Sequence, residues 1–235
     1  MTSPENHLLH VIIILYLLLH STTATSDLTT LIYKGCANQN FQNPLSSQHL
    51  KSLYTSLLSQ SSTTNFYKTT VNTVTGLYQC RSDLSNSDCD TCVKSLPETI
   101  SRVCNTNTMA ARVQLVGCYM RYEAVGFPQA PGTELLYKKC GSGRVDDEKL
   151  DGAFALLTKG VGKGYFAGEF EDVYVLGQCD GDLGGGECVN CVKTAVEIGR
   201  SECRSSVSGR VFLFRCFVSY TYYPDGVPGS GGDGG

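Results

Sequence analysis

The sequence predicts an α+β fold of two tandem disulfide-rich domains, each an antiparallel sheet with two helices packed on one face. Three observations lead to this prediction. Twelve cysteines form two copies of one spacing pattern, helical and strand-like segments recur in the same order in both copies, and the N-terminus has the features of a secretory signal peptide.

The cysteine spacing is the most specific of these observations. Successive cysteines lie 44, 9, 3, 12 and 14 residues apart in the first copy and 39, 9, 3, 12 and 13 apart in the second. Three consecutive identical steps indicate a duplicated domain, and an even number per copy indicates a closed disulfide framework. The two sets are Cys36, Cys80, Cys89, Cys92, Cys104 and Cys118, and Cys140, Cys179, Cys188, Cys191, Cys203 and Cys216.

The N-terminal segment indicates the compartment. A nine-residue apolar run from Val11 to Leu19 is too short to span a bilayer, which takes about 20 residues, but it suits the core of a signal peptide. Small residues follow, and cleavage after Ser26 would start the mature chain at Asp27. An uncleaved anchor is the alternative. We assign residues 1–26 to a signal peptide and expect the secretory pathway, where cysteines pair.

The cysteine copies also set the domain boundaries. Residues 27–125 form the first predicted domain and residues 133–224 the second, joined by a short linker, 126–132, that contains two prolines. The final segment, 225–235, is rich in glycine and is expected to be a flexible stalk.

Composition argues against several classes of function. Residues 27–131 carry a net charge of +2 and residues 132–225 a net charge of −3, with no basic stripe, so we expect no nucleic-acid partner. Of the four histidines, only His49 lies outside the signal peptide. A histidine-based zinc site or catalytic triad is therefore not expected, and we predict no catalytic residue, no metal and no cofactor.

The first copy contains two helical segments among strand-like ones. Leu50, Leu53 and Leu57 lie on one helical face, and Pro97 is expected to kink or split the second helix. The expected N-caps are Ser46 or Ser47 for the first helix and Ser87 or Asp88 for the second. The predicted segments are a strand at 31–34, a helix at 47–58, strands at 66–74 and 76–81, a helix from 87, and one long strand at 111–122.

The second copy repeats this order. Its predicted segments are a strand at 134–139, a helix at 146–159, strands at 165–172 and 173–178, a helix at 186–204 and one long strand at 210–223.

Six cysteines allow 15 pairings, and the predicted elements favour one of them. Cys89 and Cys92 are three residues apart at a helix start, so each is easier to pair elsewhere. Cys80–Cys89 closes a short loop, Cys104 can reach the first strand at Cys36, and Cys92 is left for Cys118. With the same order in the second copy, the pairs are Cys140–Cys203, Cys179–Cys188 and Cys191–Cys216. A redox or zinc role for the Cys-x-x-Cys pairs is disfavoured, because other cysteines are available to each.

These residues resemble a known family. The spacing Cys-x8-Cys-x2-Cys and the segment ARVQLVGCYMRYE (111–123) resemble the plant cysteine-rich secretory-repeat domain, also called the stress-antifungal or ginkbilobin-homologous domain. The segments IYKGCANQ (32–39) and FYKTT (66–70) are most similar to the plasmodesmata-located protein branch. The resemblance implies a five-stranded antiparallel sheet in each domain and the disulfide order given above. It also implies a non-enzymatic role in cell-to-cell traffic through plasmodesmata, linked to callose, defence and viral movement.

Proteins of that branch carry a transmembrane helix and a short cytoplasmic tail after the two domains. This sequence has no second apolar stretch of membrane length, so we expect a membrane helix to follow the stalk beyond residue 235. The expected location is then the extracellular side of the cell membrane at plasmodesmata. If the chain stops there, the alternative is secretion into the apoplast.

The resemblance also implies candidate ligand-binding residues. Single-domain antifungal relatives bind mannose through an Asn after the first cysteine, an Arg six residues before the last and a Glu five residues after it. The matching residues are Ala37, Arg112 and Glu123 in the first copy and Gly141, Arg210 and Thr221 in the second. Arg112, Glu123 and Arg210 are therefore the candidate ligand-binding residues. Mannose binding by the same mechanism is not expected, because each missing group leaves a sugar hydroxyl unpaired. The alternative is that Arg112 and Glu123 simply pair on the sheet.

Three hypotheses remain open from the sequence. The chain is a plasmodesmal regulator, a secreted lectin-like or antifungal protein of the apoplast, or the ectodomain of a truncated cysteine-rich receptor kinase. The expected partners are a cell-wall glycan or a membrane receptor, with homo- or hetero-oligomers forming through exposed sheet faces.

Overall fold

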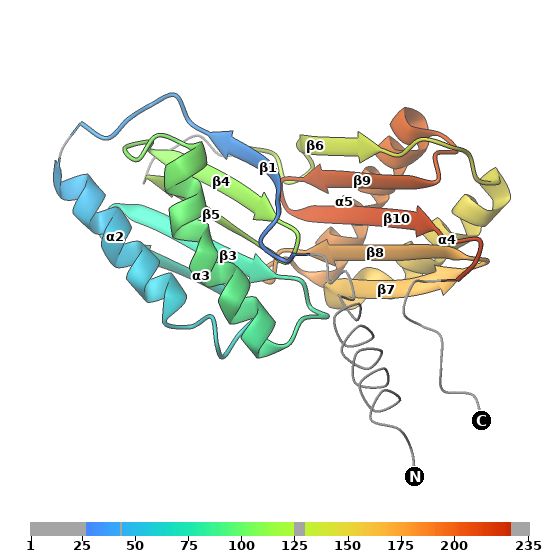
Figure 1. The fold of residues 1–235 in the computed structure, drawn as a ribbon, viewed down its shortest axis with the longest axis horizontal. Coiled ribbons are helices and arrows are strands. Elements are labelled where there is room, and N and C mark those ends of the chain that lie inside the picture. Colours follow the sequence, from blue (N-terminus) through green and yellow to red (C-terminus); the bar gives the residue numbers. More distant parts are fainter. Residues whose placement is uncertain (1–26, 43, 125–129, 227–235) are drawn as a thin grey trace, which may run out of the picture.

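The structure is a computed structural model that describes residues 27–42, 44–124 and 130–226 (Figure 1). The predicted signal peptide, most of the predicted linker and nearly all of the Gly-rich stalk lie outside these residues. In the described ranges, no helix is long and apolar enough to cross a membrane.

Each copy forms a five-stranded antiparallel sheet with two helices, which confirms the predicted fold class. The strand order of the first sheet is β1-β4-β5-β3-β2. The elements are β1 (Leu31–Cys36), α2 (Pro44–Leu58), β2 (Phe66–Val71), β3 (Val74–Cys80), α3 (Asn86–Val103), β4 (Ala110–Leu115) and β5 (Cys118–Ala124).

The second copy has the equivalent strand order, β6-β9-β10-β8-β7. Its elements are β6 (Leu135–Cys140), α4 (Asp147–Gly160), β7 (Tyr165–Phe170), β8 (Val173–Cys179), α5 (Gly185–Ile198), β9 (Ser208–Leu213) and β10 (Cys216–Tyr222). A short 3-10 turn at Val161–Lys163 follows α4, and a π-helical turn at Gly199–Cys203 follows α5.

The long final strand predicted in each copy was wrong. The segment 111–122 is the hairpin β4–β5 with a turn at Val116 and Gly117, and the segment 210–223 is the hairpin β9–β10 with a turn at Phe214 and Arg215. Each turn is only two residues long and lies between a leucine and a cysteine, so the sequence pattern does not show the break. These hairpins supply the fifth strand of each sheet.

Other boundaries differ for local reasons. The first hairpin turns at Asn72, whose φ of 53° lies in the left-handed region, and Gly76 lies inside β3 rather than at a break. A Cβ at Gly76 would lie 2.7 Å from Leu53 Cδ2, so this glycine allows α2 to pack closely on the sheet. Helix α2 begins at Pro44, which suits a first-turn position, so neither Ser46 nor Ser47 is its cap.

Helix α3 also begins earlier than predicted. Its cap is Ser85, whose Oγ accepts a hydrogen bond from the backbone N–H of Asp88 at 3.1 Å. The helix is not split at Pro97 and runs to Val103. In the second copy, the helix predicted to reach residue 204 leaves α geometry after Ile198.

The core of each copy lies between its sheet and its helices. Leu53 and Leu57 of α2 are fully buried, as are Leu157 and, nearly so, Phe154 of α4. Phe154 meets the ring of Tyr220 edge-on at 5.2 Å. The leucine face predicted for the first helix is the face of α2 that packs on the sheet.

All twelve cysteines are bonded, in the six pairs named from the sequence. In the first copy, Cys80–Cys89 joins β3 to the start of α3, Cys92–Cys118 joins α3 to β5, and Cys36–Cys104 joins β1 to the end of α3. The second copy repeats this scheme. Each second helix is therefore attached to its sheet near its start and again by a cysteine beyond its end.

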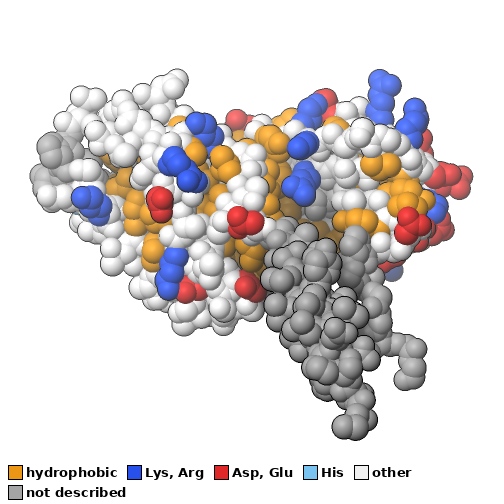
Figure 2. Space-filling view, in the orientation of Figure 1, with side chains coloured by type: hydrophobic (Ala, Val, Ile, Leu, Met, Phe, Trp, Pro, Cys, Tyr) orange, Lys and Arg blue, Asp and Glu red, His pale blue; other side chains and the backbone are white. Residues whose placement is uncertain are grey.

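The two copies face opposite ways. In Figure 1, α2 and α3 lie in front of the first sheet, whereas α4 and α5 lie behind the second. Each sheet thus keeps a helix-free face, and the two copies meet where parts of these faces come together. Over the side shown in Figure 2, acidic and basic side chains are interspersed.

Candidate functional site

The candidate site lies at the junction of the two copies, on the helix-free face of the first sheet. Because side chains alternate along a strand, Met120 and Tyr122 of β5 point into the core, while Tyr119, Arg121 and Glu123 point to the opposite face. The chain therefore places a phenol, a guanidinium and a carboxylate in a row on this face.

A reciprocal pair of glutamines fastens the junction. Gln79 and Gln178 occupy equivalent positions, each just before the second cysteine of its copy, and both are buried. The side-chain oxygen of Gln79 accepts from the backbone N–H of Gly181 at 2.9 Å, and that of Gln178 accepts from the N–H of Ser82 at 3.1 Å. Gln178 also donates to the carbonyl of Cys80 at 2.8 Å. These bonds satisfy backbone groups that would otherwise be buried unpaired.

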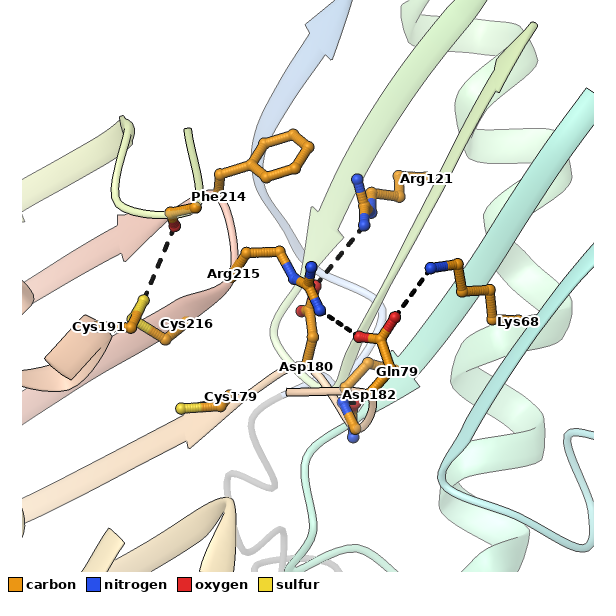
Figure 3. A network of polar contacts seen from close by, with 12 residues as sticks. Lys68, Gln79, Arg121, Cys179, Asp180, Asp182, Cys191, Phe214, Arg215 and Cys216 are labelled. Atoms are coloured by element: carbon orange, nitrogen blue, oxygen red, sulfur yellow. Dashed lines mark hydrogen bonds and ion pairs between the residues drawn. A yellow bond between two sulfur atoms is a disulfide. The ribbon is translucent and has the colours of Figure 1, made fainter. Parts of the chain in front are cut away.

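Beside the glutamines, a buried carboxylate gathers groups from both copies (Figure 3). Asp180 is only 4% exposed and accepts a hydrogen bond from the hydroxyl of Tyr119. Its Oδ2 lies 2.8 Å from Nε of Arg215 and 3.8 Å from Nη2 of Arg121. Burial, and then the charge of Asp180, raises the pKa of Tyr119 well above its usual value of 10, so this phenol stays a hydrogen-bond donor.

A more exposed ion pair extends this network. Asp182 pairs with Arg215 and with Lys68 of the first copy, whose Nζ lies 2.9 Å from its Oδ2. Partial burial acts to raise the pKa of Asp182, but Lys68 and Arg215 outweigh it and lower the pKa below its usual 3.8.

Aromatic rings close the other side of the junction. Tyr33 of β1 stacks on Tyr137 of β6 with centroids 5.4 Å apart, and Phe212 lies 5.3 Å from Tyr33. The edge strands β1 and β6 are thus in contact through their rings, which adds apolar burial to the polar contacts.

Arg112, a candidate from the sequence, is part of this junction. Its Nη1 donates to the carbonyl of Phe214 at 2.7 Å, and its guanidinium lies 4.2 Å from the ring centroid of Tyr119. The guanidinium of Arg121 lies 4.5 Å from the ring centroid of Phe214. Phe214, in the β9–β10 turn, therefore reaches across to both arginines.

A groove of about 310 Å³ runs beside these arginines, between β1, β4, β5 and Phe214. We call it the junction groove. Residues that line it include Tyr33, Gly35, Ala37, Arg112, Arg121, Glu123, Leu136 and Phe214. All three candidate positions of the first copy, including Ala37, therefore meet in one cavity.

The candidate position of the second copy lies elsewhere. Arg210 is exposed on the helix-free face of the second sheet, where it lines a separate groove together with Thr221. At the third position, a Cβ on Gly141 would lie 2.2 Å from Oγ of Ser208, so there is no room for an asparagine without rearrangement. The structure does not bring Arg210 together with Arg112 and Glu123.

Sequence reasoning missed most of the junction. Gln79 and Gln178 carried a usable signal, because the same amide precedes the same cysteine in both copies. Asp180 and Phe214 carried none, since their partners lie in the other copy. Among the described residues, no cluster of three or more His, Cys, Asp or Glu side chains could hold a metal ion.

Comparison with known proteins identifies the family. Residues 34–125 and 144–223 match the family described as "Salt stress response/antifungal". The chain is 50% identical over 218 residues to plasmodesmata-located protein 2 of Arabidopsis thaliana, and the alignment covers 88% of this chain and 71% of the relative. The chain belongs to the plasmodesmata-located protein family. It is also 44% identical over 228 residues to protein 1 of the same family and species, covering 86% of this chain and 75% of that one.

Two solved structures of family members share the tandem architecture. The tandem DUF26 ectodomain of the Arabidopsis thaliana receptor-like protein PDLP8 superposes with a TM-score of 0.77 at 30% identity, covering 83% of this chain and 98% of that one. The equivalent ectodomain of PDLP5 gives 0.72 at 27% identity, covering 83% and 100%. Each superposition covers both copies, so the arrangement of the two copies is shared with these family members.

Proposed function

We propose that this chain is the extracellular, non-enzymatic module of a plasmodesmal protein that regulates cell-to-cell traffic, with links to callose deposition, defence and viral movement. The observation that carries the proposal is the 50% identity to plasmodesmata-located protein 2, which extends through both copies. Its place is the extracellular side of the cell membrane at plasmodesmata, reached through the secretory pathway.

The architecture suits a binding module outside the cell. Three disulfides per copy restrict the unfolded chain, at about 2–4 kcal/mol each in the chain-entropy model. The charged side chains at the junction, such as Asp180 and Arg215, are occupied with each other, which is typical of a structural network rather than of acid–base catalysis. The proposed partners are a cell-wall glycan or a membrane receptor, with oligomers forming through exposed sheet faces.

A secreted lectin-like protein is the second candidate. It is favoured by the junction groove, where Ala37, Arg112 and Glu123 meet at the positions of the sugar site in antifungal relatives. Against it, Ala37 offers no amide, and Arg112 already donates to the carbonyl of Phe214. A protein that regulates plasmodesmata without binding mannan fits these contacts better.

The test is localisation combined with a movement assay. The protein, expressed from its full coding sequence and fused to a red fluorescent protein, is produced in single leaf epidermal cells together with free green fluorescent protein. We expect red puncta in the wall that coincide with stained callose, and fewer neighbouring cells reached by the green protein. A control carries residues 1–26 alone before the red protein. Diffuse red fluorescence in the apoplast with unchanged green movement would contradict the proposal, and mannan binding would then support the lectin-like alternative.

A further inference from the structure

We propose that the junction groove binds a small carboxylate with an apolar body, such as an aromatic acid, held by Arg112 and Arg121. The inference deepens the proposed function, because it names the ligand class that the extracellular module would recognise. It departs from the neutral sugar suggested by the family resemblance, and the reasons are the lining of the groove and the charges within it.

Most of the groove wall is apolar. Ala37, Ala110 and Leu136 line it together with the rings of Tyr33 and Phe214. Its volume of about 310 Å³ is at the lower end of the range for small-molecule sites, which are mostly apolar with a few placed polar groups. A ligand with one planar apolar portion would cover this wall, whereas a sugar would leave hydroxyl groups facing it without partners.

The polar end of the groove is cationic. Arg112 and Arg121 are directly opposite each other in the β4–β5 pairing, and Glu123 is the carboxylate of the lining. The ammonium group of Lys34 is not part of this end, because it donates to the carbonyl of Val103. Two like charges placed opposite each other on neighbouring strands are destabilising unless something neutralises them. The carboxylate of Asp180 lies 3.8 Å from Arg121 and is shared with Arg215. An anion between the two guanidinium groups would relieve the repulsion.

Some hydrogen-bond donors at the arginine end of the junction groove are also unpaired. Nε of Arg112 and Nε of Arg121 are buried, and neither has a hydrogen-bond partner in the described part of the chain. Buried polar groups are nearly always paired, so two unpaired N–H groups beside one groove indicate a missing acceptor. A carboxylate accepts from several N–H groups at once and matches the planar fork of a guanidinium.

Aromatic rings pack against both guanidinium groups and orient them in the groove. Tyr119 lies under the guanidinium of Arg112 and Phe214 under that of Arg121, at 4.2 Å and 4.5 Å to the ring centroids. Since Phe214 belongs to the second copy and the arginines to the first, the site is complete only when the two copies are docked. A bound carboxylate would therefore also stabilise the junction.

Gly35 offers a selective way to block the groove. A Cβ at Gly35 would meet no atom within 4 Å, and this glycine lines the cavity, so Gly35→Leu would fill the space without a clash at the first carbon. Gly186, in the first turn of α5, is equally open and lies outside the groove, so Gly186→Leu is the matched control.

The experiment measures binding of benzoate to the folded, disulfide-bonded chain by saturation-transfer NMR, with benzamide as the neutral analogue and mannose as the sugar. We expect saturable benzoate binding with a Kd on the order of 1 mM, and benzamide at least about tenfold weaker, because a charged hydrogen-bond pair is lost. Gly35→Leu should abolish benzoate binding at an unchanged melting temperature, whereas Gly186→Leu should leave it intact.

A charge variant provides an independent check. Arg121→Gln should weaken benzoate at least about tenfold while leaving benzamide unchanged. Equal binding of benzoate and benzamide, benzoate binding that survives Gly35→Leu, no saturable benzoate binding, or mannose binding that Gly35→Leu removes would each overturn the proposal. Failure of the proposed function is distinguishable, because wall puncta and reduced movement of the green protein do not depend on benzoate.

Discussion

The two copies share one scaffold, but their helix-free faces carry different side chains. At equivalent positions of the last strand, the first copy has Tyr119, Arg121 and Glu123, whereas the second has Phe217, Ser219 and Thr221. The disulfides and the strand order are the same in both copies. Duplication has therefore kept what builds the fold, while the polar groups of the exposed face differ between the copies.

Two arginines at the same position show how context decides the role of a side chain. Arg112 and Arg210 each lie six residues before the last cysteine of their copy. Arg112 is enclosed by the second copy and bonded to Phe214, while Arg210 is exposed on its sheet. The local sequence is alike, so the difference comes from docking one copy against the other.

The largest effect is expected for the buried carboxylate. Asp180→Ala leaves the hydroxyl of Tyr119 buried without its acceptor and leaves Arg215 with only the more exposed Asp182, which should cost about 3–5 kcal/mol of unfolding free energy. The matched variant is Arg81→Ala at the equivalent position of the first copy, where the partner is Asp83 on the partly exposed surface. It should cost about 1 kcal/mol or less in urea unfolding. Equal losses would mean that Asp180 does not join the copies.

The equivalent arginines give the next contrast. Arg112→Ala removes a bond to a carbonyl at the junction and the stacking on Tyr119, so we expect a loss of about 2–3 kcal/mol. Arg210→Ala should stay within about 0.5 kcal/mol, because the side chain is exposed. The check is urea unfolding of both variants side by side. A destabilising Arg210→Ala would show that the second sheet has a partner of its own.

A smaller contrast separates the two glutamines. Gln178→Ala removes two hydrogen bonds across the junction. Gln79→Ala removes one across the junction and a longer one, 3.2 Å, to the carbonyl of Cys80 in its own copy, so both variants should destabilise and Gln178→Ala by less than about 1 kcal/mol more. The difference is measured from the urea midpoints of the two variants, provided that the slope of unfolding free energy against urea concentration is the same for both. The reverse order would contradict the hydrogen bonds described for the junction.

The smallest effect concerns pH. The pKa of Asp182 is lowered in the folded state by Lys68 and Arg215, so its contribution is present above its unfolded pKa near 3.8 and is lost as pH falls through the lower folded value. Asp182→Asn should cost less than about 1 kcal/mol near neutral pH, because these side chains are partly exposed. The difference between wild type and variant should vanish in strong acid. A constant difference at all pH values would rule out an ionic origin.

Local signals explain which parts of the fold the sequence could predict. The cysteine steps, the leucine face of α2 and the helix predicted at 146–159 are all recognised within a few residues, and the structure has the corresponding elements. The turn at Phe214 and Arg215 has no Gly, Pro, Asn or Asp, so the sequence offers no break between β9 and β10. Its geometry depends on the hairpin and on docking against the first copy.

The candidate site was predictable only in part. The family resemblance selected Arg112 and Glu123, and the structure places both at the junction groove. It could not show that Phe214 would contact Arg112 or that Asp180 would lie near Arg121. The two residues of each contact are roughly 60 to 100 positions apart in the sequence. Contacts between duplicated domains leave no periodic trace in either copy.

The most direct test of a joined two-copy unit is calorimetric unfolding of the disulfide-bonded chain. If the glutamine pair and Asp180 couple the copies as described, unfolding gives one transition whose calorimetric and van't Hoff enthalpies agree. Two separate transitions, one for each copy, would contradict this account.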